Sequence, residues 1–377
     1  MILSTNQIIA KNFINARGWR TKRKLLLIES DDWGAVRMPS RQVYERLVLK
    51  NIAVDKLHID KYDSLEGSED LDALYNILAS FRDINNNPAV LTAYSVIANP
   101  DFNKIEASGR KEYFYEVISE TYKRNSHTAR TLDLIREGIQ NKVYYPQFHG
   151  REHIHPKRWL EAINSNSKKE DEAFRERAII SSKMLNDQTV HLLNYFAAFD
   201  YSSQNELNEI KDALKDGLIH FEKIFGFKSF SFVAQATKWG DGILETLANF
   251  GVKLIPGQQL HPDGKGNLRT INKTWGAKNN LGQIHWRRNC LFEPTRDQNY
   301  DWINRCLKEI EIAFRWGKPA VISSHRENYI GSIFPENRQK SLQKLKTLLT
   351  EVQKKWPEVE FIDTEQLGKL MIEDLAK

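Results

Sequence analysis

Short apolar runs alternate with longer amphipathic stretches along the chain. The apolar runs are four to nine residues long and rich in β-branched and aromatic side chains, which is typical of buried strands. Seven or eight of them stand out, at 25–29, 89–97, 143–148, 229–233, 252–255, 283–286, 320–324 and 359–362. Because strands that alternate with helices form parallel sheets covered by those helices, the pattern predicts an α/β protein.

The amphipathic stretches carry apolar residues at steps of three and four. Between 207 and 225 these residues form one continuous stripe, which Gly226 ends, and similar stripes lie within 244–250, 302–314 and 342–352. A stripe with this period covers one side of a helix, and glycine is a common helix terminator. We therefore predict four helices that pack an apolar side against the core.

Two longer segments, about 41–86 and 156–203, do not fit the alternation, and we interpret them as helical insertions. No linker rich in Pro, Gly or Ser divides the chain, and no internal repeat is apparent. We therefore expect a single domain over residues 1–377, built as one elaborated α/β barrel rather than as two domains.

Composition narrows the classes of function. The 377 residues are 41% hydrophobic and include only 19 Gly, 11 Pro and 2 Cys, which excludes disordered, collagen-like and disulfide-scaffold proteins. Since no apolar run approaches the roughly 20 residues of a membrane helix and the first 24 residues lack a secretory signal pattern, we expect no membrane span and a cytoplasmic location. The net charge of +6 comes from 55 basic and 49 acidic residues that are interspersed, so nucleic-acid binding is not predicted.

Polar residues with catalytic potential follow three of the predicted strands. Asp31 and Asp32 follow the first strand, His149 and His153 follow the strand at 143–148, and His325 follows the strand at 320–324. Active sites of α/β barrels form at the carboxyl ends of the strands, so these five side chains are expected to meet. Together they supply what a mononuclear metal hydrolase needs, which is three ligands, a base and an acid.

Each motif also has a simpler interpretation. An Asp-Asp pair can start a turn or cap a helix, and a histidine after a buried strand can be a core residue. The segment His149–His153 also spells the H-x-x-E-H pattern of some metallopeptidases, with Glu152 as the base. That pattern requires a helix, whereas residues 143–148 are predicted to form a strand, and Pro146, Gly150 and Pro156 break helical continuity around the motif.

The order and spacing of these motifs resemble the polysaccharide deacetylase family (carbohydrate esterase family 4, with the NodB-type fold), and within it the intracellular bacterial branch. The resemblance implies a distorted barrel of seven or eight β/α units. It further implies that Asp32, His149 and His153 bind a divalent metal, that Asp31 is the catalytic base and that His325 is the general acid. The metal expected is zinc, with cobalt, nickel and manganese as alternatives, and the reaction is removal of acetyl groups from N- or O-acetylated sugars.

The sequence departs from the family pattern in two places. The family's Arg-x-Pro-Tyr motif should follow the strand at 229–233, but that stretch reads AQATKWGDG, and the aspartate that normally orients the acid histidine is not identifiable. Arg151 or Arg326 could substitute for the missing arginine, and Trp33 and Trp239 could stack on a sugar, so these four residues are the predicted substrate contacts.

Two alternatives to the deacetylase hypothesis therefore stay open at this point. The chain could be a carbohydrate-binding protein built on a catalytically degenerate deacetylase fold, or a metallopeptidase that uses Glu152. Under the deacetylase hypothesis the partner is an acetylated sugar or oligosaccharide, either free or linked to an anionic carrier that the basic charge would tolerate.

Overall fold

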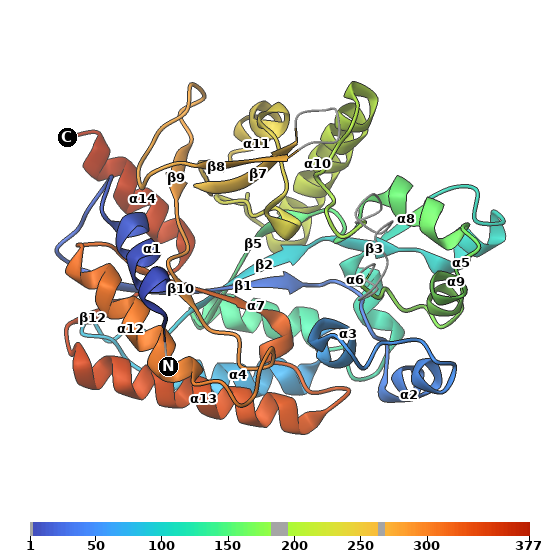
Figure 1. Ribbon diagram of the computed structural model, residues 1–377, viewed down its shortest axis with the longest axis horizontal. Coiled ribbons are helices and arrows are strands. Elements are labelled where there is room, and N and C mark those ends of the chain that lie inside the picture. The colour runs from blue at the N-terminus through green and yellow to red at the C-terminus, as the bar shows by residue number, and fades with distance from the viewer. Residues whose placement is uncertain (1–2, 182–194, 263–267) are drawn as a thin grey trace.

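A parallel sheet runs through the centre of the computed structural model, which describes residues 3–181, 195–262 and 268–377 (Figure 1). Its strands are hydrogen-bonded in the order β10-β11-β1-β2-β5, and β12 also pairs with β1. The bounds are β1 (Lys24–Trp33), β2 (Leu91–Val96), β5 (Tyr144–Gly150), β10 (Cys290–Leu291), β11 (Ala320–His325) and β12 (Val359–Phe361). The predicted α/β class and its parallel sheet are confirmed.

Single parallel bridges continue the series beyond β5. Phe148 bridges to Phe232, and Ser231 bridges to Leu254 in β6 (Leu254–Pro256). Strand β6 then pairs in parallel with β9 (Ile284–Trp286). The predicted strand at 229–233 is thus reduced to these bridges. No ladder joins β9 to β10 among the described residues, so closure of the sheet into a barrel is not confirmed.

Strand β1 is buried on both faces, as a central strand of a parallel sheet should be. Leu26 and Ile28 pack in the main hydrophobic core, whereas Leu25 and Leu27 pack on the other face with Trp275. This alternation places residues of even and odd number on opposite faces. The strand also continues beyond the predicted end at Glu29 and includes Asp31, Asp32 and Trp33.

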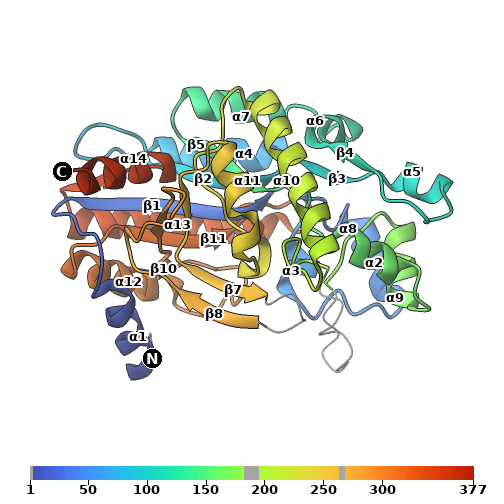
Figure 2. The same cartoon turned by 90° about the horizontal axis from the view of Figure 1, so that it is seen from above.

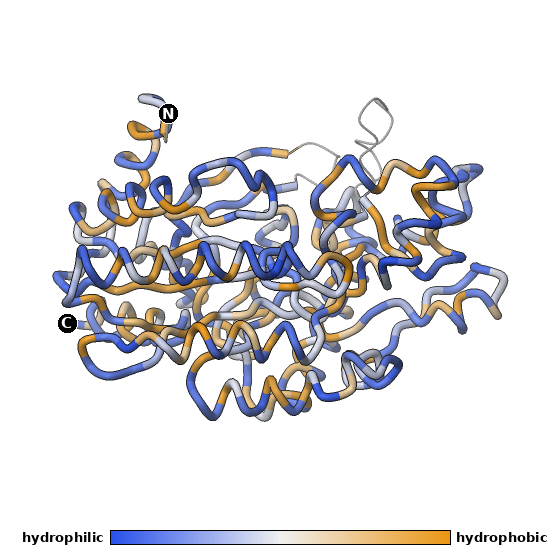
Figure 3. Tube along the Cα trace, turned by 90° about the horizontal axis from the view of Figure 1, so that it is seen from below, coloured by the Kyte–Doolittle hydropathy of each residue, from blue (hydrophilic) through white to orange (hydrophobic). Residues whose placement is uncertain are grey.

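The four predicted helices are present as α10 (Gln204–Phe225), α11 (Leu244–Asn249), α12 (Trp302–Arg315) and α13 (Pro335–Lys355). Gly226 ends α10 with a φ of 82°, a left-handed conformation that glycine adopts without a steric penalty. Figure 3 shows hydrophobic and hydrophilic residues alternating along the outer helices, as the stripes predict. The described part of the chain contains no helix that is long and apolar enough to cross a membrane.

The described structure also contains further α-helices and two pairs of antiparallel strands. They are α1 (Thr5–Asn15), α2 (Arg41–Leu49), α3 (His58–Tyr62), α4 (Ser68–Ala79), α5 (Phe102–Ala107), α6 (Ile118–Thr121), α7 (Thr131–Gln140), α8 (Pro156–Ile163), α9 (Lys168–Arg175), α14 (Thr364–Leu375), and the pairs β3 (Ala98–Pro100) with β4 (Tyr115–Val117) and β7 (Gln258–Pro262) with β8 (Leu268–Asn272).

The two segments interpreted as insertions contain helices in different settings. Segment 41–86 holds α2, α3 and α4, and Leu71, Leu74 and Leu78 of α4 belong to the main core. Segment 156–203 holds α8 and α9, and its residues 182–194 lie outside the described part. Figures 1 and 2 place α2, α5, α8 and α9 together at the end of the molecule toward which β1 and β2 point.

The stripe of α10 generates a stability prediction. Leu214 is 1% exposed in the main core, so truncation to alanine removes buried apolar surface and leaves a cavity. We expect Leu214→Ala to lower the free energy of unfolding by about 2–5 kcal/mol. Asp212→Ala, on the exposed side of the same helix, should change it by less than about 0.5 kcal/mol. Urea denaturation of both variants tests the difference, and equal effects would contradict this packing of α10.

Candidate metal centre and active site

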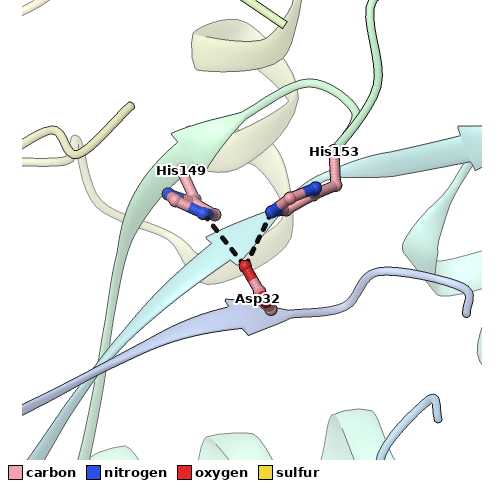
Figure 4. Close-up of side chains that lie close together, drawn as sticks. All are labelled: Asp32, His149 and His153. Atoms are coloured by element: carbon pink, nitrogen blue, oxygen red, sulfur yellow. Dashed lines mark ion pairs between the residues drawn. The ribbon is translucent and has the colours of Figure 1, made fainter. Parts of the chain in front are cut away.

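Asp32, His149 and His153 converge at the carboxyl ends of β1 and β5. Nε2 of His153 lies 2.7 Å from Oδ1 of Asp32, and Nε2 of His149 lies 3.3 Å from the same oxygen. Each residue offers one ligand atom, and the three atoms lie within 4.8 Å of one another. Figure 4 shows both imidazoles directed at the Asp32 carboxylate.

Two unusual backbone conformations bring these side chains together. Asp32 has a φ of 76°, and the pairing of β1 with β2 shifts register between Ser30 and Trp33. Aspartate tolerates this left-handed region better than most residues, and strained backbone of this kind clusters at functional sites. Gly150 has a φ of 129°, and a Cβ there would lie 2.7 Å from Nε2 of Gln235. The positive φ at this turn after His149 therefore favours glycine at residue 150.

The donor set fits a divalent cation. Nδ1 of His149 donates a hydrogen bond to the Val233 carbonyl at 2.7 Å, which leaves the lone pair on Nε2 facing Asp32. That Nε2 is buried and has no hydrogen-bond partner among the described residues. Burial lowers the pKa of His153 to about 4, so its ring is neutral at physiological pH. Two imidazoles and one carboxylate are ligands that zinc and similar metals bind.

Asp31 is held by Arg288, a residue that the sequence analysis did not identify. Nη1 and Nη2 of Arg288 donate to Oδ2 and Oδ1 of Asp31 at 2.6 and 2.7 Å, and Nε donates to Glu29 at 2.6 Å. Burial opposes ionisation of Asp31, but the guanidinium outweighs it and lowers the pKa of this carboxyl. Arg288 follows the predicted strand at 283–286, so the strand-end rule indicates its position but not its pairing with Asp31 and Glu29.

His325 has its own carboxylate partner, which the sequence analysis also missed. Its Nδ1 lies 2.7 Å from Oε1 of Glu293, whose other oxygen accepts a hydrogen bond from Asn328. Partial loss of water around the ring disfavours the cation, but the Glu293 carboxylate outweighs this effect and raises the pKa of His325. His325 pairs in register with Asp31 across β1 and β11, and its side chain is 42% exposed. The site thus combines Asp31, which is held as a carboxylate anion, with His325, which favours the protonated form.

The two predicted stacking residues are both buried. Trp33 is 1% exposed, lies between Tyr144 and Tyr329, and donates from Nε1 to Ser30. Trp33 packs in the main core with Leu26 and Ile28, so the irregular backbone at Asp32 breaks the strand alternation and turns this ring inward. Trp239 is fully buried against Phe232 and lines a cavity of only about 70 Å³. Neither ring presents an exposed face to a sugar in this structure.

The two predicted arginines are committed to other partners. Arg326 is fully buried and bonds to Asp63 and Glu66, so it does not replace the missing family arginine beside Asp31. Arg151 pairs with Glu152 and Asp216. Although Arg151 lies two residues from His149 and Arg326 follows His325, both guanidinium groups thus pair with carboxylates outside the metal-compatible group.

The His149–His153 segment is not helical. His149 lies in β5, and α8 begins only at Pro156. Glu152 is 4% exposed and pairs with Arg151 at 2.7 Å, and burial raises its pKa. The segment therefore lacks the helix on which the metallopeptidase pattern depends.

No protein-family model matches the sequence, and no curated protein matches it significantly. Among solved structures, a protein from Mycobacterium smegmatis described as a polysaccharide deacetylase has a TM-score of 0.42 at 11% identity, covering 96% of this chain and 94% of its own. One from Pseudomonas aeruginosa with the same description has a TM-score of 0.41 at 10% identity, covering 92% and 91%. A carbohydrate esterase family 4 pseudoenzyme from Bacillus anthracis has a TM-score of 0.39 at 9% identity, covering 92% and 66%. The chain is thus similar, over most of its length and at low identity, to structures described as polysaccharide deacetylases.

Proposed function

We propose that this protein is a metal-dependent hydrolase that removes acetyl groups from N- or O-acetylated sugars. The observation that carries the proposal is one arrangement: a metal-compatible group (Asp32, His149, His153) flanked by Asp31 with its arginine and by His325 with its glutamate. The acetylated sugar as substrate is supported by the order of the motifs in the sequence, whereas the hydrolytic chemistry is supported by the geometry.

A divalent cation held by Asp32, His149 and His153 would supply a Lewis acid for the acetyl carbonyl and would lower the pKa of nearby water. We propose zinc, since two imidazoles and a carboxylate leave a position open for substrate, and cobalt, nickel and manganese are the alternatives.

The residues on either side would move the protons. Asp31, kept ionised by Arg288, accepts a proton as water attacks the acetyl carbon and a C–O bond forms. His325, protonated beside Glu293, donates a proton to the sugar nitrogen or oxygen as the C–N or C–O bond of the acetyl group breaks. The products are acetate and the free amine or alcohol. The partners of Asp31 and His325 also count against a degenerate site, because both catalytic positions are supported.

The first test of the proposed function concerns the metal. Prolonged dialysis against a chelator should abolish acetate release from an N-acetylated chitooligosaccharide, and added zinc should restore it. His153→Gln should weaken zinc binding by at least about tenfold, because even a supporting residue of such sites typically contributes that much. The control His220→Gln alters a partly exposed histidine on α10 and should bind zinc as the wild type does. Equal zinc affinity in both variants, measured by competition with a chromogenic chelator, would contradict the proposed ligand set.

The second prediction concerns the base. Arg288→Gln should lower kcat by about 10²–10⁴, the range of general base catalysis, because Asp31 loses the cation that keeps it ionised and oriented. The matched control is Arg287→Gln, since Arg287 bonds instead to the Lys273 carbonyl and to Asn272. Arg288→Gln also removes the cation that pairs with Glu29, so its fold is checked by circular dichroism, and Asp31→Asn provides a second variant. Full activity of Asp31→Asn would rule out Asp31 as the base.

The third prediction concerns pH. Glu293 raises the pKa of His325, so Glu293→Gln should lower that pKa and reduce the fraction of protonated acid above it. The alkaline limb of the kcat profile should therefore move to lower pH, while the acidic limb stays in place. Glu336→Gln, an exposed position in α13, is the control. An unchanged alkaline limb in Glu293→Gln would separate Glu293 from the acid function of His325.

A further inference from the structure

A cavity of about 630 Å³ is lined in part by Arg37, whose guanidinium contacts Asp32 of the metal-compatible group. Its walls come from α2, α5, α9 and the segment that follows β1, which Figure 1 shows at the end of the molecule toward which β1 points. Five arginines line it, against two glutamates, and the rest of the lining is largely apolar, including Val43, Leu65 and Phe102. A cavity of this size can hold a ligand considerably larger than one sugar ring.

Arg37 joins this cavity to the proposed active site. It lines the cavity and is only 5% exposed, and its Nη2 lies 3.7 Å from Oδ2 of Asp32. Its Nε is 3.4 Å from Asp63 but lacks hydrogen-bond geometry to any described residue. A buried guanidinium N–H without a hydrogen bond is costly, because the lost hydration is not replaced. A bound acceptor at this point would remove that cost.

The other arginines leave an excess of positive charge in the cavity. Arg46 pairs with Glu176 at 2.5 Å and Arg124 pairs with Glu116 at 2.8 Å, so both lining glutamates are already neutralised. Arg175 pairs with Asp171 at the surface. Arg177 is exposed and has no ion pair with any residue in the described ranges. The cavity therefore offers guanidinium donors at both its buried and its exposed sides.

We propose that this cavity binds the diphosphate and carrier portion of a diphosphate-linked acetylated sugar, with Arg37 and Arg177 contacting the phosphates. Guanidinium groups bind phosphate oxygens with paired hydrogen bonds, and the apolar lining suits an attached nucleoside or isoprenoid. The inference rests on the proposed deacetylation, because the contact between Arg37 and Asp32 places the sugar of such a substrate beside the metal-compatible group. Nucleoside-linked and isoprenoid-linked substrates share the sugar diphosphate group. Comparison of kcat/KM for the two substrates identifies which carrier the cavity binds.

Binding is tested first, by calorimetry with inorganic pyrophosphate on the zinc-loaded protein. Arg177→Gln should weaken binding at least about fivefold, whereas Arg136→Gln, which removes an exposed arginine of α7 paired only with Asp133, should not. Pyrophosphate held only by the metal would bind both variants equally, and this result would overturn the inference. Absence of pyrophosphate binding would overturn it as well.

Specificity is tested second, by comparing kcat/KM for free, nucleoside-diphosphate-linked and isoprenyl-diphosphate-linked N-acetylated sugars. At least one linked substrate should be preferred over the free sugar, and Arg177→Gln should reduce that preference about fivefold or more. Hydrolysis of free sugar without any such preference overturns this inference and leaves the proposed function standing. Binding of pyrophosphate that depends on Arg177, without acetate release from any sugar, overturns the proposed function and leaves the phosphate site standing.

Discussion

The ion pair between Arg288 and two carboxylates of β1 is the interaction on which the candidate site depends. Glu29 and Asp31 are two residues apart, so they lie on the same face of the strand and both reach one guanidinium. Glu29 is fully buried and also accepts from Trp286 and Thr364. Without Arg288 two neighbouring anions would be buried without a cation, which is among the most destabilising arrangements a protein can contain. Arg288 thus compensates the buried carboxylates of the central strand and keeps Asp31, the candidate base, ionised.

The neighbouring carboxylates Asp31 and Asp32 show how environment separates two identical groups. Asp31 faces an arginine, whereas Asp32 faces two imidazoles and is turned by a left-handed backbone conformation. Asp32 also belongs to a series of buried ion pairs. Arg37 lies between Asp32 and Asp63, and Asp63 also pairs with Arg326. Opposite charges alternate along this series, which limits the cost of removing each one from water.

The sequence was sufficient for the parallel strands, the four striped helices and the residues that gather at the strand ends, because these depend on local periodicity and on the general geometry of parallel sheets. It was not sufficient for Arg288 and Glu293. Their roles arise from pairings between segments more than 30 residues apart, which no local pattern encodes. The position of Trp33 was missed for a simpler reason: the apolar run ends at Glu29, while hydrogen bonding extends the strand to residue 33 through charged positions that a local pattern reads as a turn.

The hydroxyl of Thr364, at the start of α14, donates to Glu29 near the beginning of the chain. The groups that neutralise this buried carboxylate and donate hydrogen bonds to it therefore belong to residues 286, 288 and 364, which are translated long after Glu29. During synthesis the early strand carries acidic side chains whose partners do not yet exist. Its apolar residues can collapse at once, but its charged end stays solvated until the later segments emerge, so the candidate site is not completed before residue 364 has been translated.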